Sequence, residues 1–449
     1  MGDFLSFLSS WTGFDINAFV DAAGSNPFWA MGVFFVSWGW IIFVGLMLWM
    51  ITQAWLVRVQ TKYGAKKEWI LLKITVPKAT EQTPRAVENL FASLAGAHSP
   101  ISFVEKWFLG HTQSPMAVEI ASIDGNVSYY MHAERRLRDL MEASVYAQYP
   151  DAEIHEVPDY ALNVPSHYPD EEWDMWCTEM IPVKPDSYPL KTYPEFEDAV
   201  SGEFKDPLSS MLENFSRLGP GEQAWYQIVI TPTYQREEGA RAEKLIAKLK
   251  GVPEKPHKKN ILDHATDLPF IAARTTVDFL MGSELGGGEH KKEDKKELIP
   301  RMMALSPGER YILEAIERKA SKIGFLSKVR FVYVGKKNVM MKARAVQPFI
   351  GAIKQMNTFN MQALKPDSKH VGVNGSLLIN KDHRNDHRKN HMIKAYRARS
   401  NWKGMSWFHL SSEELATLWH FPIFLQVKAP GTVKTEAKKS EPPSNIPFA

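Results

Sequence analysis

Residues 28–56 read FWAMGVFFVSWGWIIFVGLMLWMITQAWL, an almost wholly apolar run that decides the architecture of the chain. No charged residue occurs between Asp21 and Arg58. A helix of about 20 apolar residues crosses the hydrocarbon core of a bilayer, whereas a helix buried in a soluble domain is rarely this long and this free of charge. The sequence therefore predicts a transmembrane helix over residues 28–57.

Aromatic residues mark both this span and the segment before it. Tryptophan is favoured at the membrane–water interface, so Trp55 is expected to lie near one. Residues 1–27 are rich in aromatic and aliphatic side chains, and we expect them to lie in the outer interface. The residues assigned to the span itself are Phe28, Trp38, Trp40, Trp49, Trp55 and Leu56.

Basic residues fall on one side of the span only. Residues 1–27 contain no lysine or arginine. The linker after the span, residues 58–68, contains four basic residues: Arg58, Lys62, Lys66 and Lys67. Because basic residues stay on the cytoplasmic side, we expect a single-pass protein of the inner (cytoplasmic) membrane, with its N-terminus outside and its C-terminal part in the cytoplasm.

The composition of the whole chain is that of a globular protein. Of its 449 residues, 44% are hydrophobic and 23% charged, which is enough for two or three domains with buried cores. A net charge of +3 gives no general argument for nucleic-acid binding. The single cysteine, Cys177, excludes an intramolecular disulfide and suits a reducing compartment.

The fold class predicted after the span is α+β, in two ferredoxin-like sandwich units. In residues 69–160 the pattern runs strand, helix, strands, helix, strand, which is the order of a split βαβ unit. Asp124-Gly125 predicts the turn of a hairpin. The expected strands are residues 69–76, 106–109, 116–122, 127–131 and 152–157.

Residues 161–425 are expected to form the second unit, with a flexible insert at residues 251–304 and a disordered tail at residues 426–449. Ser306 with Glu309, and Ser411 with Glu414, are capping boxes that begin helices. The acidic connector at residues 158–174, with Glu171, Glu172 and Asp174, favours a solvated face. The expected strands are residues 179–184, 225–230 and 329–334, and further helices are expected after Asp206 and over residues 343–356.

Motifs that carry catalysis are absent from the sequence. It contains no G-x-x-x-x-G-K-[ST], H-E-x-x-H, G-x-S-x-G or G-x-G-x-x-G, so we expect a protein that is not an enzyme and has no cofactor. His383, His387 and His391 recur every four residues and would share one face of a helix. The basic residues around them oppose a bound cation, so no metal site is assigned.

The same segment, residues 381–399, is dense in basic side chains. We interpret it as an anion-binding face for nucleic-acid phosphates or anionic lipid. A solvated basic helix without a ligand is an equally open alternative, and in that case Glu413, Glu414 and the proline-rich tail are the next candidates for docking a protein. The residues assigned to the anion-binding face are Arg384, Arg388, Lys389, Lys394, Arg397 and Arg399.

Three stretches carry a resemblance to a known kind of domain. They are residues 143–160 (ASVYAQYPDAEIHEVPDY), 206–232 (DPLSSMLENFSRLGPGEQAWYQIVITP) and 410–422 (LSSEELATLWHFP). In this order they resemble the uncharacterised membrane-anchored domain found in front of or beside FtsK/HerA-like ATPases of conjugation-type (type IV) secretion. In relatives a Pro-Pro-x-Asn-x-Pro stretch leads into the ATPase. Here that stretch begins at Pro442, close to the end of the sequence, so the resemblance implies a motor supplied by a partner.

Two functions from different classes follow. The first is a non-catalytic, membrane-anchored docking subunit of a DNA- or protein-transfer ATPase that acts in trans. The second is a stand-alone membrane scaffold or envelope protein with no role in DNA transfer. The lipid bilayer is a partner in both, and self-association into a homo-oligomer stays open.

Overall fold

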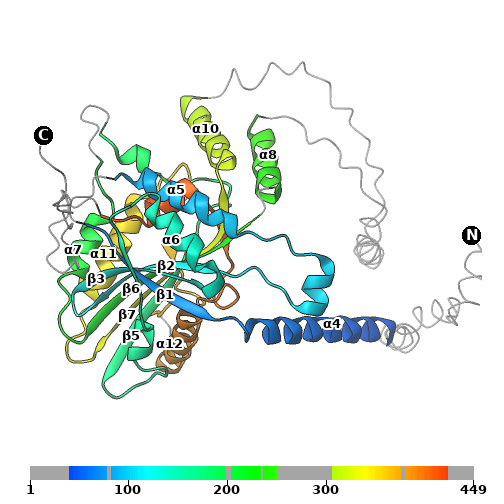
Figure 1. Cartoon of the computed structure of the whole chain (residues 1–449), viewed down its shortest axis with the longest axis horizontal. Coiled ribbons are helices and arrows are strands. Elements are labelled where there is room, and N and C mark those ends of the chain that lie inside the picture. Colours follow the sequence, from blue (N-terminus) through cyan, green and yellow to red (C-terminus); the bar gives the residue numbers. More distant parts are fainter. Residues whose placement is uncertain are drawn as a thin grey trace, which may run out of the picture. The chain divides into compact units, whose positions relative to one another are not determined.

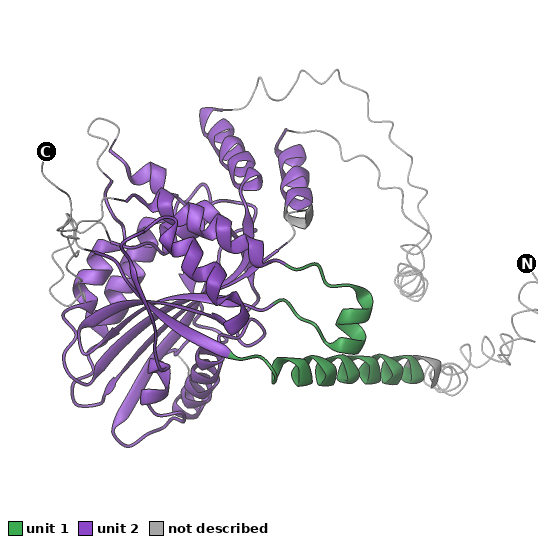
Figure 2. Cartoon of the chain, in the orientation of Figure 1, with its two compact units in different colours: residues 1–68, 99–113 green, residues 69–98, 114–449 purple. Residues whose placement is uncertain are grey.

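A computed structural model describes residues 40–77, 82–198, 204–233, 236–250, 306–375 and 380–422. The chain divides into two compact units (Figure 2). Unit 1 comprises Met1–Glu68 and Ser99–Gln113, and unit 2 comprises Trp69–His98 and Ser114–Ala449. The expectations for residues 1–39, for the insert and for the tail lie outside the described residues, as do the span residues Phe28 and Trp38.

Unit 1 is built on one long helix, α4, Trp40–Gly64. Its segment Phe43–Gly64, 22 residues, is long and apolar enough to cross a membrane, and none of its most apolar window is buried. The chain therefore has one candidate membrane-spanning helix in its described part. The helix continues through most of the basic segment that we expected to be a linker, because no residue between Leu56 and Gly64 interrupts it.

The second element of unit 1 corrects the sequence interpretation. Residues 106–109 were expected to be a strand, but Glu105–Leu109 is a single turn of π-helix, η3. Gly110 ends this turn with a left-handed backbone, φ 74°. The apolar side chains of this stretch therefore belong to no sheet.

Unit 2 contains one nine-stranded sheet in which every pairing of the described strands is antiparallel. The strand order is β4-β1-β3-β2-β6-β7-β5-β8, and β9 also pairs with β7. The strands are β1 Trp69–Thr75, β2 Met116–Ile123, β3 Asn126–Glu134, β4 Glu153–Glu156, β5 Trp173–Pro182, β6 Glu222–Pro232, β7 Gly324–Lys336, β8 Leu364–Pro366 and β9 Phe408–Ser411.

Helices cover both faces of this sheet (Figure 1). Alternate residues of each strand point to opposite faces, so Tyr226 of β6 belongs to the core that includes α5, α6, α7, α11 and α13, while its neighbour Trp225 belongs to the core that includes α12. The α+β class is thereby confirmed. The helices are α5 Pro84–Leu94, α6 Arg138–Tyr146, α7 Ser209–Phe215, α8 Arg236–Lys250, α10 Pro307–Ser321, α11 Lys342–Gln355, α12 Lys381–Arg397 and α13 Ser412–Leu418.

The two halves of the sheet repeat one topology. The chain order β1-α5-β2-β3-α6-β4 gives the sheet order β4-β1-β3-β2. Apart from helices α8 and α10, which lie between β6 and β7, the second half has the chain order β5-α7-β6-β7-α11-β8, and its sheet order is β8-β5-β7-β6. The halves join where β2 pairs with β6, with Ile120 opposite Tyr226. The two units predicted from the sequence therefore share one sheet and one compact unit.

Local signals in the sequence were mostly accurate. Asp124 and Gly125 connect β2 to β3 with positive φ at both residues, 51° and 85°, as the hairpin turn requires. Both capping boxes are present, at the starts of α10 and α13. The prediction for β5 was wrong: the strand begins at Trp173 rather than Glu179, so Asp174 lies in a strand and not in a solvated connector.

Candidate functional site

The basic segment predicted to bind anions forms a helix, α12, followed by a short turn. Arg384 and Lys394 are exposed on it. Lys389 is paired within the protein, because its ammonium group lies 2.7 Å from Asp174 and 3.2 Å from Asp386. These two carboxylates neutralise the positive charge of Lys389, which we had predicted to bind an anion.

Arg388 and Arg397 are also held by the protein. Arg388 is buried, and its guanidinium group donates to the backbone carbonyls of Gly372 at 2.7 Å and Ser368 at 3.1 Å. Arg397 is half-buried and donates to the carbonyls of Ala161 at 2.9 Å and Val164 at 2.7 Å. Their donors therefore fix loops against α12 rather than face a ligand.

Arg399 lies deepest of the six, with 1% of its surface exposed. Its Nε donates to Glu119 at 3.0 Å, and its Nη1 and Nη2 donate to Asp159. Burial opposes ionisation of Asp159, but the hydrogen bonds and charge of Arg399 outweigh it and lower the pKa of this carboxyl. The triad is a buried ion-pair network that ties the end of α12 to the sheet.

The assumption that this segment presents its arginines to solvent is therefore wrong for Arg388 and Arg399. The sequence did hold a sign that Arg388 is buried. Arg388, Met392 and Tyr396 are spaced four residues apart and therefore share one face of the helix. That face packs on the sheet, with Met392 and Tyr396 fully buried. Arg384 and Lys394 are what remains exposed of the predicted face.

The three histidines of this segment do not converge. His383 and His387 are exposed and His391 is partly buried. Among residues 40–422 that the structure describes, no three His, Cys, Asp or Glu side chains are grouped closely enough to hold a metal ion.

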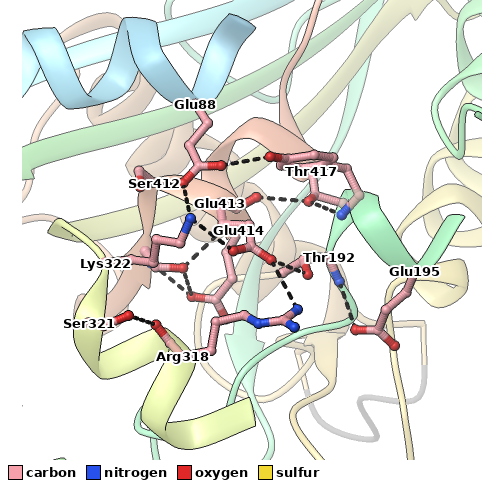
Figure 3. Close-up of polar contacts among 12 residues, drawn as sticks. Glu88, Thr192, Glu195, Arg318, Ser321, Lys322, Ser412, Glu413, Glu414 and Thr417 are labelled. Carbon is pink, nitrogen blue, oxygen red and sulfur yellow. Dashed lines mark hydrogen bonds and ion pairs between the residues drawn. The ribbon is translucent and has the colours of Figure 1, made fainter. Parts of the chain in front are cut away.

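A second cluster of charged groups surrounds α13 (Figure 3). Glu414 closes the capping box on Ser411 and also forms an ion pair with Lys319, with 3.0 Å between the charged atoms. Both side chains of the pair are buried. One carboxylate thus begins α13 and fastens it to α10.

Glu413 and Glu88 share a single ammonium group (Figure 3). Lys322 Nζ lies 2.7 Å from Glu88 of α5 and 3.3 Å from Glu413 of α13. Thr192 donates to Glu413 at 2.6 Å, and the hydroxyl of Tyr193 donates to Glu88 at 2.8 Å. Burial opposes the charge on Lys322, but the two carboxylates outweigh it and raise the pKa of this ammonium group.

The Glu413 and Glu414 carboxylates were the next candidates for docking a protein, and the structure corrects this. Both are buried and both are satisfied within the fold. The sequence held no sign of the Glu88–Lys322 pair, because 234 residues separate its members. Glu413 and Glu414 instead hold α13 between α5 and α10.

An open pocket of about 470 Å³ adjoins this cluster. Arg85 and Arg318 are exposed on its lining, and the Glu88–Lys322 pair forms part of its wall. Guanidinium groups bind carboxylates through paired hydrogen bonds. Arg318 already lies 3.9 Å from Glu413, so the pocket offers an acidic side chain the exposed guanidinium group of Arg85 and the remaining donors of Arg318.

The described residues thus combine one apolar helix with an α+β unit built on a single antiparallel sheet. The chain belongs to the family described as "Domain of unknown function (DUF8128)", whose model matches residues 59–426. The match begins inside α4 and covers nearly all of unit 2. No curated protein matches the chain.

Proposed function

We propose that this chain is a single-pass membrane protein that holds unit 2 on the cytoplasmic side, as a non-catalytic docking subunit. The observation that carries the proposal is the exposed apolar surface of α4, whose most apolar window has no buried residue. Exposing so large an apolar surface to water is unfavourable, because the burial of apolar surface is the main driving force of folding and association. A bilayer satisfies it, and a helix also satisfies its own backbone there.

The orientation rests on charge. Arg58 and Lys62 occupy the last two turns of α4, and Lys66 and Lys67 follow directly. Basic residues near the end of a span favour the cytoplasmic side, where anionic headgroups attract them. This asymmetry supports our proposal of an inner membrane with unit 2 in the cytoplasm.

We infer that each half of the sheet is a ferredoxin-like sandwich. Two observations support this: both halves have the order of a split βαβ unit, and helices α5, α6, α7 and α11 pack on the same face. The shared sheet joins the two halves in one compact unit. Its fold alone assigns no activity.

The partner that we propose is an FtsK/HerA-like transfer ATPase supplied in trans, on the basis of the sequence resemblance. Residues 206–232 correspond to α7 and β6, and residues 410–422 to β9 and α13. These residues build the core, so the resemblance supports kinship of the domain more than a shared contact surface. The pocket at Arg85 and Arg318 is the place where we expect an acidic partner segment to dock.

Affinity purification of the tagged full chain from detergent-solubilised membranes tests this proposal. We expect a Walker-type ATPase to co-elute, and we expect the double variant Arg85→Ala/Arg318→Ala to lose it. Arg384→Ala, an exposed arginine of α12, is the matched control and should retain the ATPase. If the chain elutes from the solubilised membranes without any ATPase, the docking function is wrong and the stand-alone scaffold is favoured.

A further inference from the structure

The segment at residues 101–109 (ISFVEKWFL) carries an unusual amount of exposed apolar surface. The exposed fractions are 70% for Phe103, 59% for Val104, 62% for Phe108 and 55% for Leu109. Single exposed apolar residues are common on proteins, but a contiguous patch of this kind marks a contact with another apolar phase. The η3 turn holds this patch in one place.

Several contacts fix this segment along α4, within unit 1. The indole Nε1 of Trp55 donates to the carbonyl oxygen of Trp107 at 3.0 Å. Further along, Gly110 approaches the backbone of α4 so closely that a Cβ there would lie 2.5 Å from the Val59 carbonyl oxygen. Beyond it, the rings of His111 and Tyr63 lie 4.6 Å apart. The segment therefore runs in the same direction as α4, and its apolar turn lies beside the part of the helix that precedes Arg58.

The lining of the hollow between the turn and α4 is apolar. This hollow, about 320 Å³, is formed on the helix side by Ile51, Thr52 and Trp55. The residues on the other side are Phe103, Trp107 and Phe108. Apolar surface is thus continuous from the helix to the turn.

The depth of the turn follows from helix geometry. Ile51 precedes Arg58, the first charged residue after the span, by seven residues, and Trp55 precedes it by three. At 1.5 Å per residue these positions lie about 10 Å and about 5 Å on the membrane side of Arg58. Interfacial segments bury their apolar face about 5–10 Å into the boundary between headgroups and acyl chains.

We propose that residues 101–109 are a second membrane-contact element, inserted into the headgroup–acyl boundary of the bilayer that α4 crosses, on the side of Arg58. The occupant of the patch is lipid, because the patch continues the apolar surface of α4 at the depth of the inner interface. Exposed Lys106 then meets anionic headgroups. This inference rests on the proposed anchoring of α4.

Depth-dependent fluorescence of the full chain in liposomes tests the inference. Phe103→Cys and Phe108→Cys variants are labelled with an environment-sensitive nitrobenzoxadiazole probe, and bromine on the acyl chains serves as quencher. Native Cys177 does not interfere, because it is fully buried and burial raises the pKa of its thiol to about 12. Phe359→Cys, at an exposed phenylalanine of unit 2, is the matched control.

We expect brominated lipid to quench the probes at Phe103 and Phe108 several-fold more than the probe at Phe359, and dithionite to reduce them several-fold more slowly. Equal behaviour at the three positions would overturn the inference. Protection from dithionite without quenching by brominated lipid would also overturn it, because a second copy or a partner protein would then cover the patch.

A probe at Leu48 separates this inference from the anchoring itself. Leu48 is exposed in the middle of the apolar part of α4, so strong quenching is expected there. Quenching at Leu48 without quenching at Phe103 rejects only the second contact. Absence of quenching at Leu48 rejects the anchoring on which the inference rests.

Discussion

Replacing Arg399 by alanine is expected to destabilise unit 2 strongly. The substitution removes the only cation that the structure places within ion-pair distance of the fully buried Glu119 among the described residues. It also removes both guanidinium contacts of Asp159. Glu119 would keep its hydrogen bonds from Tyr160 and Gln227, both at 2.7 Å, but its charge would stay buried without compensation.

The expected magnitude follows from this burial. Breaking a buried ion pair by removing one partner costs about 3–5 kcal/mol, because the remaining charge is left uncompensated. With a urea m-value of about 3 kcal/mol/M, the midpoint of unfolding should fall by about 1–2 M. Arg384→Ala, at an exposed position of α12, should change the free energy of unfolding by less than about 0.5 kcal/mol.

Urea unfolding of the full chain in non-ionic detergent measures both variants. Tryptophan fluorescence reports on the same region, since Trp225 is fully buried and its ring lies 5.2 Å from that of Tyr396. Equal midpoints for Arg399→Ala, Arg384→Ala and the unmodified chain would refute the buried network and restore the anion-binding interpretation.

Three further predictions concern other parts of the chain. Burial, helped by the charge of Arg399, lowers the pKa of His132 from 6.5 to about 4. Between pH 4 and pH 6.5, His132 is therefore protonated in the unfolded chain but neutral in the folded chain. The contribution of neutral His132 to the free energy of unfolding, about 3 kcal/mol, is complete above pH 6.5 and is lost as the pH falls to 4. The urea midpoint should therefore fall over this pH range, and His132→Gln should make that fall smaller. An equal fall in the variant and the unmodified chain would contradict the lowered pKa of His132. Gly110→Ala should detach residues 99–113 from α4 and expose them to protease, whereas Gly96→Ala, with open space at its Cβ, should not; equal digestion would reject the close approach. In binding of the full chain in detergent to DNA, Arg384→Ala/Lys394→Ala should flatten the slope of log K against log salt by about 2, since these two cations of the predicted face are exposed. A further flattening on adding Arg388→Gln would contradict the burial of Arg388.

Much of the fold was predictable because its signals are local. Asp124 and Gly125 tolerate the positive φ that a tight hairpin needs, and Ser306 and Ser411 each precede a glutamate by three residues. These patterns depend on residues within one turn of each other. The start of β5 at Trp173 was not predicted because the acidic residue Asp174 suggested a solvated connector. The cation that pairs with Asp174, Lys389, is 215 residues away in the sequence.

The candidate site was less predictable, because the composition of a segment does not show which distant residues pair with its side chains. The arginines after residue 381 form a basic cluster in the sequence, but backbone carbonyls and two carboxylates of distant segments hold those that are buried. Residues 107–109 are three consecutive apolar side chains, a pattern that also predicts a strand. In our account those side chains face lipid instead of a sheet.

Alkaline carbonate extraction of membranes tests the anchoring most directly. If α4 crosses the bilayer as we propose, the full chain should stay in the membrane pellet. Leu46→Lys/Leu48→Lys should release it, since each lysine at the centre of a span costs about 2.5–3.5 kcal/mol of insertion free energy. Both leucines are exposed in unit 1, and Phe359→Lys, at an exposed position of unit 2, is the control that should remain in the pellet. Recovery of the unmodified chain in the carbonate supernatant would contradict the account.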